Sequence, residues 1–474
     1  MSNVSASYDV LARDLHGRIV LPGDRAYETE RLIWNGTFDR RPSAIAKCAG
    51  PADVVASLAF ARERGLPFTV AGGRHEAAGT SLADGALAID LGPMQGVIVD
   101  PAARRAVVQA GCKWQIVDRE TQLHGLAVTG GTNSDTGVAG LTLGGGIGYL
   151  MRKQGATADN LLSMQAVTCA GELIRIGKDD NPDLFWGMRG AGANFAVVTS
   201  FEFQLHPVGP TVYGGPLVVP AERSREALRH WREFMAEAPD EVSTMAFLIR
   251  HPELPSIPSE WWGRPVALFW MLYIGDPGGA AEVLRPLREK VRPAADLCGP
   301  TTYVDVQRGT PQEQLFTRMI GHDPSWRPRF YEKGGYLRTM SDEFLDALVE
   351  SFEAAPPSAG AATPIFILMW MGGALARVPE ESMAFSRNGT CWWEVDALWE
   401  DPADDARYRE WVTETHATLT PYAVAESYIN LTMSDGAEYL RRAYGPEKYE
   451  KLVSLKKIWD PDNLLRNNKN IPPC

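Results

Sequence analysis

The chain has 474 residues, 45% hydrophobic and 22% charged, a balance typical of globular proteins. This length exceeds what one hydrophobic core usually accommodates, so we expect two domains. The net charge of −12, with Lys and Arg scattered along the chain, argues against nucleic acid as a partner.

We expect neither a secretory signal in the first residues nor a membrane-spanning segment. Residues 1–9 lack the basic segment and apolar run of a secretory signal. The longest apolar stretch, residues 364–376, is interrupted by two glycines and is too short to cross a bilayer. We therefore expect a soluble, cytoplasmic protein with no membrane partner. The six cysteines lie far apart without a C-x-x-C pair, which predicts mostly buried thiols and no metal site.

Residues 43–91 show a strand–helix–strand pattern followed by a glycine loop and another strand. The helix, expected at residues 51–64, has helically spaced apolar residues and a proline in its first turn. The strands are expected at residues 43–48, 67–71 and 86–91.

Two hairpins and a helix are predicted next. We expect paired strands at 96–100 with 105–110 and at 163–169 with 172–176, and a helix at 113–124. An alternating strand at 200–207 then runs into the segment Pro207-Val208-Gly209-Pro210, which is typical of a boundary between domains.

Beyond this boundary, helices and strands alternate in a way that predicts a sheet covered on one face by helices. Helices at 221–238 and 342–355 each carry an apolar face. Strands are expected at residues 266–274, 364–371 and 390–395, and a helix at 448–459. The many Trp residues in this part fit either core packing or an aromatic-lined cleft for a planar substrate.

Two glycine-rich segments, residues 71–79 and 137–148, are the most informative features of the sequence. Glycine has no Cβ, so backbone N–H groups in such segments can approach a bulky anion closely. His75 in the first segment adds a side chain that is a neutral nucleophile near neutral pH. A flavin dinucleotide, which has both phosphates and an electrophilic carbon, fits this combination.

The usual dinucleotide motifs do not account for these glycines. The segment Gly190-Ala191-Gly192-Ala193-Asn194-Phe195 ends in Phe and is followed by a strand-like run instead of a helix. Residues 144–148 lack the strand–turn–helix frame, and no Gly-Lys-Ser/Thr ending of a Walker loop is present. Any dinucleotide is therefore held by another fold.

Taken together in order, the sequence blocks resemble the FAD-linked oxidases of the berberine bridge enzyme type. The similar blocks run from about residue 40 to the end of the chain and are Gly72–Gly79, Thr136–Gly155, Asp159–Ser163, Asn181–Gly190, Asn194–Phe201, Gly372–Ala374, Tyr428–Asn430 and Asn468–Pro472. This resemblance implies an α+β protein with a PCMH-type (vanillyl-alcohol-oxidase-type) FAD-binding domain and a substrate domain whose antiparallel sheet is covered by helices.

The resemblance also implies four regions along the chain. These are an N-terminal extension at 1–37, the FAD-binding domain at 38–208, the substrate-binding domain at 209–424 and a C-terminal segment at 425–474. By composition alone the Asn- and Pro-rich end is typical of an exposed, frayed tail. The resemblance instead implies that this segment returns to the FAD-binding domain and contacts the flavin.

In the family, the histidine at the position of His75 bonds covalently to the 8α carbon of the flavin. Members with a second covalent link carry Cys where this chain has Asn133, so the resemblance implies FAD held by a single link. The cofactor-binding residues that it implies, besides His75, are Ala71, Gly72, Gly73, Arg74, Glu76, Gly79, Thr80, Thr136, Gly137, Gly140, Leu141, Gly144, Gly145, Gly146, Gly148, Val198, Asn468 and Asn470.

Several positions depart from the family pattern. Arg74 and Glu76 are unusually charged neighbours for the flavin, and Thr136 occupies the oxygen-gate position, where relatives often have Val, Ile or Leu. Relatives often read Y-x-N-Y near residue 430 and use the second Tyr in deprotonation, but this chain has Leu431 there. The catalytic candidates that remain are Tyr428, for which a structural role is the alternative, Glu394, Tyr331 and Tyr336.

The function implied by the resemblance is that of an FAD-dependent oxidase. Such an enzyme removes a hydride from a small alcohol, amine or phenol-type molecule of secondary metabolism or catabolism and reduces O2 to hydrogen peroxide. Three alternatives stay open: a dehydrogenase with another acceptor, a flavin-dependent oxygenase, and a flavin-binding protein without catalysis. The oligomeric state is left open as well.

Overall fold

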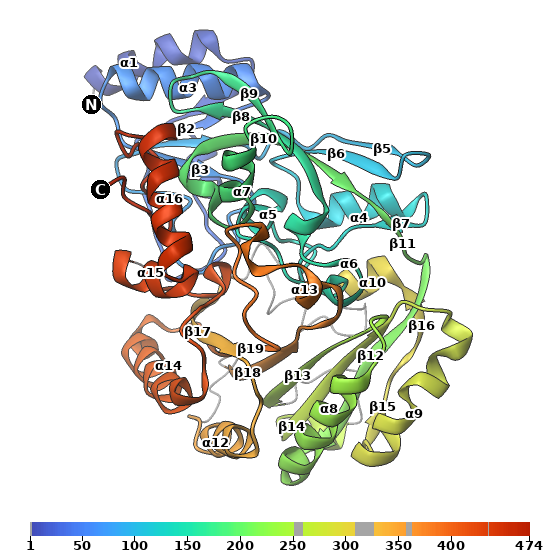
Figure 1. Cartoon of the computed structure of the whole chain (residues 1–474). Coiled ribbons are helices and arrows are strands. Elements are labelled where there is room, and N and C mark those ends of the chain that lie inside the picture. The colour runs from blue at the N-terminus through green and yellow to red at the C-terminus, as the bar shows by residue number, and fades with distance from the viewer. Residues whose placement is uncertain (1, 251–258, 309–326, 357–362, 435) are drawn as a thin grey trace.

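The computed structural model describes residues 2–250, 259–308, 327–356, 363–434 and 436–474. Its strands form four sheets, of four, five, two and eight strands (Figure 1). The strands of the three smaller sheets all precede residue 208, and the eight-stranded sheet uses strands between residues 211 and 399. Several separate sheets with helices packed on them confirm the predicted α+β class.

The first sheet carries the strand that leads into the first glycine segment. Its order is β1-β2-β4-β3, with β2, β4 and β3 parallel and β1 antiparallel to β2. Parallel strands need a crossover, and α3, with Pro51 at its start, provides the one between β2 and β3. The elements are α1 Ser2–Asp14, β1 Arg18–Val20, α2 Tyr27–Glu30, β2 Ala44–Lys47, α3 Pro51–Glu63, β3 Phe68–Ala71 and β4 Leu87–Asp90, which confirms the pattern predicted between 43 and 91.

The second sheet is antiparallel, in the order β5-β6-β10-β8-β9, and contains both predicted hairpins. The strand predicted at 200–207 is wrong at both ends. It begins at Ala196, and it stops at Gln204 because the chain then leaves β6 and pairs β11 with β7. The elements are β5 Val97–Asp100, β6 Arg105–Gln109, α4 Trp114–Gln122, β7 Leu126–Ala127, α5 Val138–Leu143, α6 Met151–Gln154, β8 Leu161–Thr168, β9 Leu173–Gly177, α7 Pro182–Ala191, β10 Ala196–Gln204 and β11 His206–Pro207.

The largest sheet is antiparallel throughout, as predicted for the substrate domain. Its order is β15-β12-β14-β13-β18-β19-β17, and β16 also pairs with β12. The strands are β12 Thr211–Pro220, β13 Val242–Arg250, β14 Pro265–Tyr273, β15 Ala295–Asp296, β16 Gly299–Thr302, β17 Arg329–Leu337, β18 Thr363–Trp370 and β19 Cys391–Trp399.

The two faces of this sheet have different neighbours. On the outer face, side chains such as Phe269 and Trp393 pack against the helices that line the lower edge of Figure 1. On the inner face, side chains such as Trp270 and Met369 belong to a different apolar cluster, which includes Tyr428. The helices in this part of the chain are α8 Ser224–Glu237, α9 Ala280–Val291, α10 Tyr303–Arg308, α12 Asp342–Glu353, α13 Gly373–Arg377 and α14 Asp405–Leu419.

The last residues fold back onto the first half of the chain. Helices α15 Ala437–Tyr444 and α16 Pro446–Trp459 follow the large sheet, and α16, red in Figure 1, packs against α7. Lys456 is fully buried and donates to the Asp460 carboxylate at 2.7 Å and to the Asn194 carbonyl at 2.8 Å. Because both charges are buried, the pair fixes how the end of the chain lies on this part.

Most of the cysteines are buried, as predicted. Four of the six cysteines are buried, while Cys298 is half-buried and Cys474 is exposed. Within the described ranges, no helix is both long and apolar enough to cross a membrane.

Candidate active site

A cavity of about 450 Å³ lies where the glycine segments, the inner face of the large sheet and the C-terminal segment meet. Most of the predicted cofactor residues border it, although they come from four separate stretches of sequence. They are Gly72, Gly73, Arg74, His75, Glu76, Thr80, Thr136, Gly137, Gly140, Leu141, Gly144, Val198 and Asn468. The fold therefore brings these residues around one space.

The remaining predicted cofactor residues do not border the cavity. These are Ala71, Gly79, Gly145, Gly146, Gly148 and Asn470. Close packing explains why glycine occupies several of these positions. A Cβ on Gly148 would lie 2.0 Å from the Gly130 carbonyl oxygen, and one on Gly146 would lie 2.2 Å from the Thr157 hydroxyl. These glycines thus permit close packing behind the cavity wall rather than direct contact with a ligand.

The two glycine segments touch each other at one point. A Cβ on Gly73 would lie 2.5 Å from the Cα of Gly137, and a Cβ on Gly137 would lie 2.5 Å from the Gly73 nitrogen. Only glycine fits at both positions, because the obstructing atoms belong to the backbone. His75 and Thr136, which lie close to this crossing in the sequence, both border the cavity.

The His75 ring is held between an indole and an amide. It stacks on Trp34 with ring centroids 5.2 Å apart and an interplanar angle of 15°. Its Nε2 lies 2.9 Å from the side-chain nitrogen of Asn133, the residue at the position of the second covalent link in some relatives. The imidazole therefore has a fixed orientation at the cavity wall.

The charged residues beside His75 are paired within the protein. Arg74, in the left-handed region at φ +54°, donates to the Asp90 carboxylate at 2.7 Å and to the Glu30 carbonyl. Glu76 accepts a hydrogen bond of 2.8 Å from the Ser81 backbone N–H. Burial raises the pKa of Glu76 above its usual value.

Tyr428 borders the cavity on the side of the C-terminal segment and packs edge-on against Phe385. Its hydroxyl accepts a hydrogen bond of 3.1 Å from Asn430, whose amide also bonds to the Gly140 carbonyl at 3.2 Å. Burial raises the pKa of Tyr428 to about 12, so the phenol stays protonated near neutral pH. This favours the structural alternative for Tyr428 over the role of catalytic base.

Of the other base candidates, only Glu394 reaches the cavity. Tyr331 and Tyr336 do not border it, and the Tyr336 hydroxyl donates to the Ser386 carbonyl at 2.8 Å. Glu394 lies on β19, with Oε2 accepting a hydrogen bond of 2.7 Å from the Trp392 indole N–H. Burial raises the pKa of Glu394 to about 7, which lets it exchange a proton near neutral pH.

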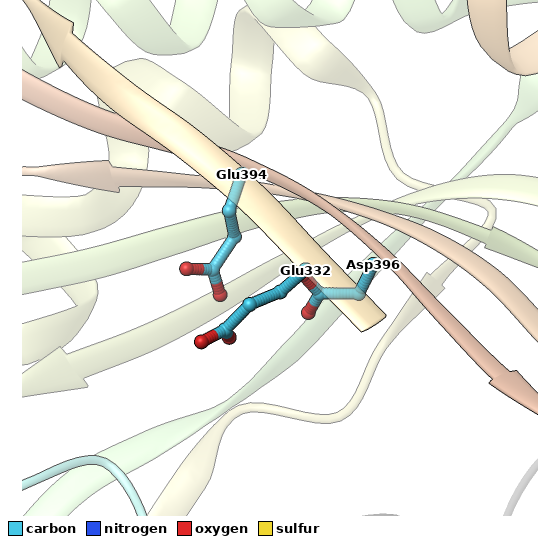
Figure 2. Close-up of side chains that lie close together, drawn as sticks. All are labelled: Glu332, Glu394 and Asp396. Carbon is cyan, nitrogen blue, oxygen red and sulfur yellow. The ribbon is translucent and has the colours of Figure 1, made fainter. Parts of the chain in front are cut away.

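Two further carboxylates, not identified from the sequence, lie beside Glu394. Glu332 on β17 and Asp396 on β19 also border the cavity, and carboxylate oxygens of the three residues lie within 4.8 Å of one another (Figure 2). The spacing of Glu394 and Asp396 is the signal that could have placed both on one face, because side chains two apart in a strand point the same way. Glu332 had no such local signal.

The cavity fits FAD by the chemistry of its wall. Asn468 donates from its amide nitrogen to the Ala193 carbonyl at 2.6 Å, and its buried Oδ1 accepts no hydrogen bond from the described residues. An unsatisfied acceptor beside a glycine wall is suited to a ligand that donates hydrogen bonds and carries phosphates. Asn467 donates to the Thr80 carbonyl at 2.8 Å and thereby links the C-terminal segment to the first glycine segment.

Two family models and several known proteins match this chain. Residues 42–177 match the family described as FAD binding domain, and residues 427–472 match the family described as berberine and berberine like. An FAD-linked oxidoreductase of Dictyostelium discoideum is 29% identical over 469 residues, covering 97% of this chain and 95% of that protein. The (R)-6-hydroxynicotine oxidase of Paenarthrobacter nicotinovorans is 28% identical over 474 residues, with 97% of each chain covered.

A solved structure of similar fold completes the comparison. The crystal structure of 6-hydroxy-D-nicotine oxidase from Arthrobacter nicotinovorans superimposes with a TM-score of 0.85 at 26% identity and covers 97% of this chain and 98% of that one. Two family matches, relatives along nearly the whole chain and a shared fold all agree with the predicted resemblance. The chain is an FAD-linked oxidoreductase that is similar to the berberine bridge enzyme-like proteins along nearly its whole length.

Proposed function

We propose that this chain is an oxidase that carries FAD on His75 through a single covalent link. It oxidises a small alcohol, amine or phenol-type molecule and uses O2 as the final acceptor, which yields hydrogen peroxide. The observation that carries this proposal is the cavity itself, which has His75 and the glycine segments on one wall and Glu394 on the other. Similarity to an oxidase of 6-hydroxynicotine supports it.

The residues that would hold FAD are those of the glycine wall and the C-terminal segment. Backbone groups of Gly72, Gly140 and Gly144 line the cavity and suit close contact with a large anion, and the Asn468 amide oxygen suits a donor. His75 would supply the single covalent link, because Asn133 offers no sulfur for a second one. FAD, when bound, supplies the hydride acceptor and passes the electrons to O2.

Glu394 is the group that takes the substrate proton. Its carboxylate is held by the Trp392 indole and faces the cavity, and its pKa of about 7 leaves a large ionised fraction near neutral pH. A carboxylate there removes the proton from a hydroxyl or amino group while the adjacent carbon loses hydride. In this assignment, Glu394 takes the role that relatives give to a tyrosine at the position of Leu431.

Thr136 bears on the choice of electron acceptor. It borders the cavity beside Gly137, at the position where the family resemblance places the oxygen gate. A small polar side chain at this wall leaves room for O2. The experiment below distinguishes the oxidase from three alternatives: a dehydrogenase, an oxygenase and a flavin carrier without catalysis.

The experiment is anaerobic reduction of the flavoprotein by a panel of alcohols, amines and phenols, followed by exposure to O2. We expect one class to bleach the flavin, and O2 to restore the colour with one hydrogen peroxide per substrate. Glu394→Gln is expected to slow bleaching by about 10²–10⁴-fold. Reoxidation only by a quinone would indicate a dehydrogenase, and labelled oxygen in the product an oxygenase. A flavin that no member of the panel bleaches would contradict the proposed function.

A further inference from the structure

Strand pairing places the three carboxyl groups of the cavity next to one another. Glu332 and Asp396 lie directly opposite each other in the antiparallel pairing of β17 and β19, and Glu394 follows on the same face of β19. Like charges directly opposite each other in a sheet are destabilising. Burial and the neighbouring carboxylates raise the pKa of Glu332 and of Asp396 well above the usual range. The fold therefore keeps a costly arrangement at the cavity wall.

Within the described part of the chain, two of these carboxyl groups also have an oxygen without a hydrogen-bond partner. Glu332 is 4% exposed and Asp396 is 5% exposed, and neither Glu332 Oε1 nor Asp396 Oδ1 bonds to any residue that the structure describes. Glu394 differs, because the Trp392 indole satisfies one of its oxygens. Buried acceptors that face a cavity without a donor indicate a site for a ligand that brings its own donors.

Among the described residues, Lys469 is the cation that affects the pKa of Glu332. It lowers this pKa, but its effect is smaller than the increase caused by burial and by the neighbouring Glu394. Lys469 donates to the backbone carbonyls of Thr432 at 2.7 Å and Ser434 at 2.6 Å. Its ammonium group is thus engaged by the C-terminal segment. The described residues thus offer one lysine to three carboxyl groups, whose raised pKa values a bound cation would lower.

The surroundings of the cluster favour an organic cation over a metal ion. Phe247, Trp270 and Phe330 border the same cavity, and aromatic rings attract ammonium groups through their faces. Ile365 and Ile367 of β18 also border the cavity, and they pair with Asp396 and Glu394 in the strand register. Calcium and magnesium ions need about six or more oxygen ligands, which apolar walls do not supply.

We propose that Glu332, Glu394 and Asp396 bind the positively charged amino group of the substrate, so the substrates of this enzyme are amines. This inference rests on the proposed function, because it concerns the same cavity. Glu332 and Asp396 would accept the N–H donors and fix the nitrogen, and the aromatic rings would contact the adjacent carbon chain.

The reaction of such a substrate balances as follows. One N–H proton passes to the carboxylate of Glu394, which leaves a lone pair on the nitrogen. The C–H bond on the adjacent carbon breaks, its hydride goes to FAD, and the nitrogen lone pair forms the C=N bond of an imine cation. Water then releases the carbonyl product and the amine, and O2 takes the two electrons from the cofactor.

The test measures binding of probes to the flavoprotein by isothermal titration calorimetry at pH 7.5. The probes are benzylammonium and benzyl alcohol, which have similar size and differ in charge. We expect benzylammonium to bind at least about 10-fold more tightly. Glu332→Gln and Asp396→Asn should each weaken benzylammonium by about 10-fold or more and leave benzyl alcohol unchanged.

The matched control is Asp118→Asn. Asp118 is also buried with no hydrogen bond to either carboxylate oxygen within the described residues, and burial raises its pKa to about 8, but it does not border the cavity. Its variant should keep the preference for benzylammonium. Flavin absorbance and melting temperature are recorded for each variant, and only variants that fold and retain flavin are compared.

Three results would overturn the inference. They are equal affinities for the two probes, no binding of benzylammonium, and binding of Mn²⁺ or Ca²⁺ that the Glu332 and Asp396 variants abolish. Failure of the proposed function is separately visible, because a protein that holds no flavin, or whose flavin no substrate bleaches, fails that proposal whatever the calorimetry gives.

Discussion

At the scale of single residues, Glu394 connects stability with chemistry. Burial raises the pKa of Glu394 from 4.5 to about 7. Between these values the folded protein binds more protons than the unfolded chain, so the free energy of unfolding falls as the pH rises through this window. The cost is present in full above pH 7 and absent below pH 4.5. The ionised carboxylate that our proposal needs near neutral pH is thus obtained at the expense of stability.

Replacing Glu394 should reveal this cost. Glu394→Gln cannot ionise, so we expect its free energy of unfolding at pH 8 to exceed that of the wild type by about 1–3 kcal/mol, and the gain to vanish at pH 4. Urea unfolding of the flavoprotein at the two pH values measures this. Glu63→Gln, at an exposed position, serves as the control and should change little at either pH. An equal gain at both pH values would contradict the assigned pKa shift.

At the scale of elements, the second glycine segment illustrates what packing demands of a sequence. Gly148 faces two backbone carbonyls, those of Gly130 at 2.0 Å and Gly131 at 2.7 Å from the position of a Cβ. Gly140 in α5 has nothing within 4 Å of that position. Two glycines of one sequence motif thus face opposite conditions, although the motif itself does not distinguish them.

The two glycines predict opposite responses to alanine. Gly148→Ala should lower the free energy of unfolding by about 1–3 kcal/mol or more, because backbone atoms cannot rotate away as a side chain can. Gly140→Ala, compared like Gly148→Ala in flavin-free protein, should leave it unchanged or raise it by about 1 kcal/mol, since alanine favours helix over glycine. Thermal unfolding of both variants is the measurement. Equal destabilisation would show that Gly148 is not held against the backbone as described.

Two strands of the large sheet were not predicted from the sequence, and the structure shows why. The strand β13 is buried along most of its length, so it lacks the polar–apolar alternation of a half-exposed strand. The strand β17 mixes charged residues with Gly334 and Gly335, which disguise it. In the first half of the chain, short strands beside clear turn signals were predicted within a few residues.

The candidate site likewise contains residues that the sequence predicted and residues that only the structure revealed. His75 and the glycine wall follow from local motifs, and thirteen of the predicted cofactor residues border the cavity besides the base candidates Tyr428 and Glu394. Glu332 lies 62 residues before Glu394 in the chain and joins it only through the pairing of β17 with β19. No local sequence pattern predicts such a pairing, so the carboxylate cluster could be identified only from the structure.

At the scale of the whole molecule, the cavity exists because three distant parts of the chain meet. The glycine segments form one wall, the inner face of the large sheet another, and the C-terminal segment closes the third side through Asn467 and Asn468. The buried pair of Lys456 and Asp460 holds that segment in place. A site that combines a cofactor wall with a substrate wall is what hydride transfer requires.

The most direct measurement of the central claim is the mass of the proteolytic peptide that contains His75, taken from acid-denatured protein. The account predicts that this peptide carries one covalently bound FAD, that the denatured protein stays yellow, and that His75→Ala loses both the added mass and the colour after denaturation. A wild-type protein that releases all its flavin on denaturation, or a flavin found on another residue, would contradict it.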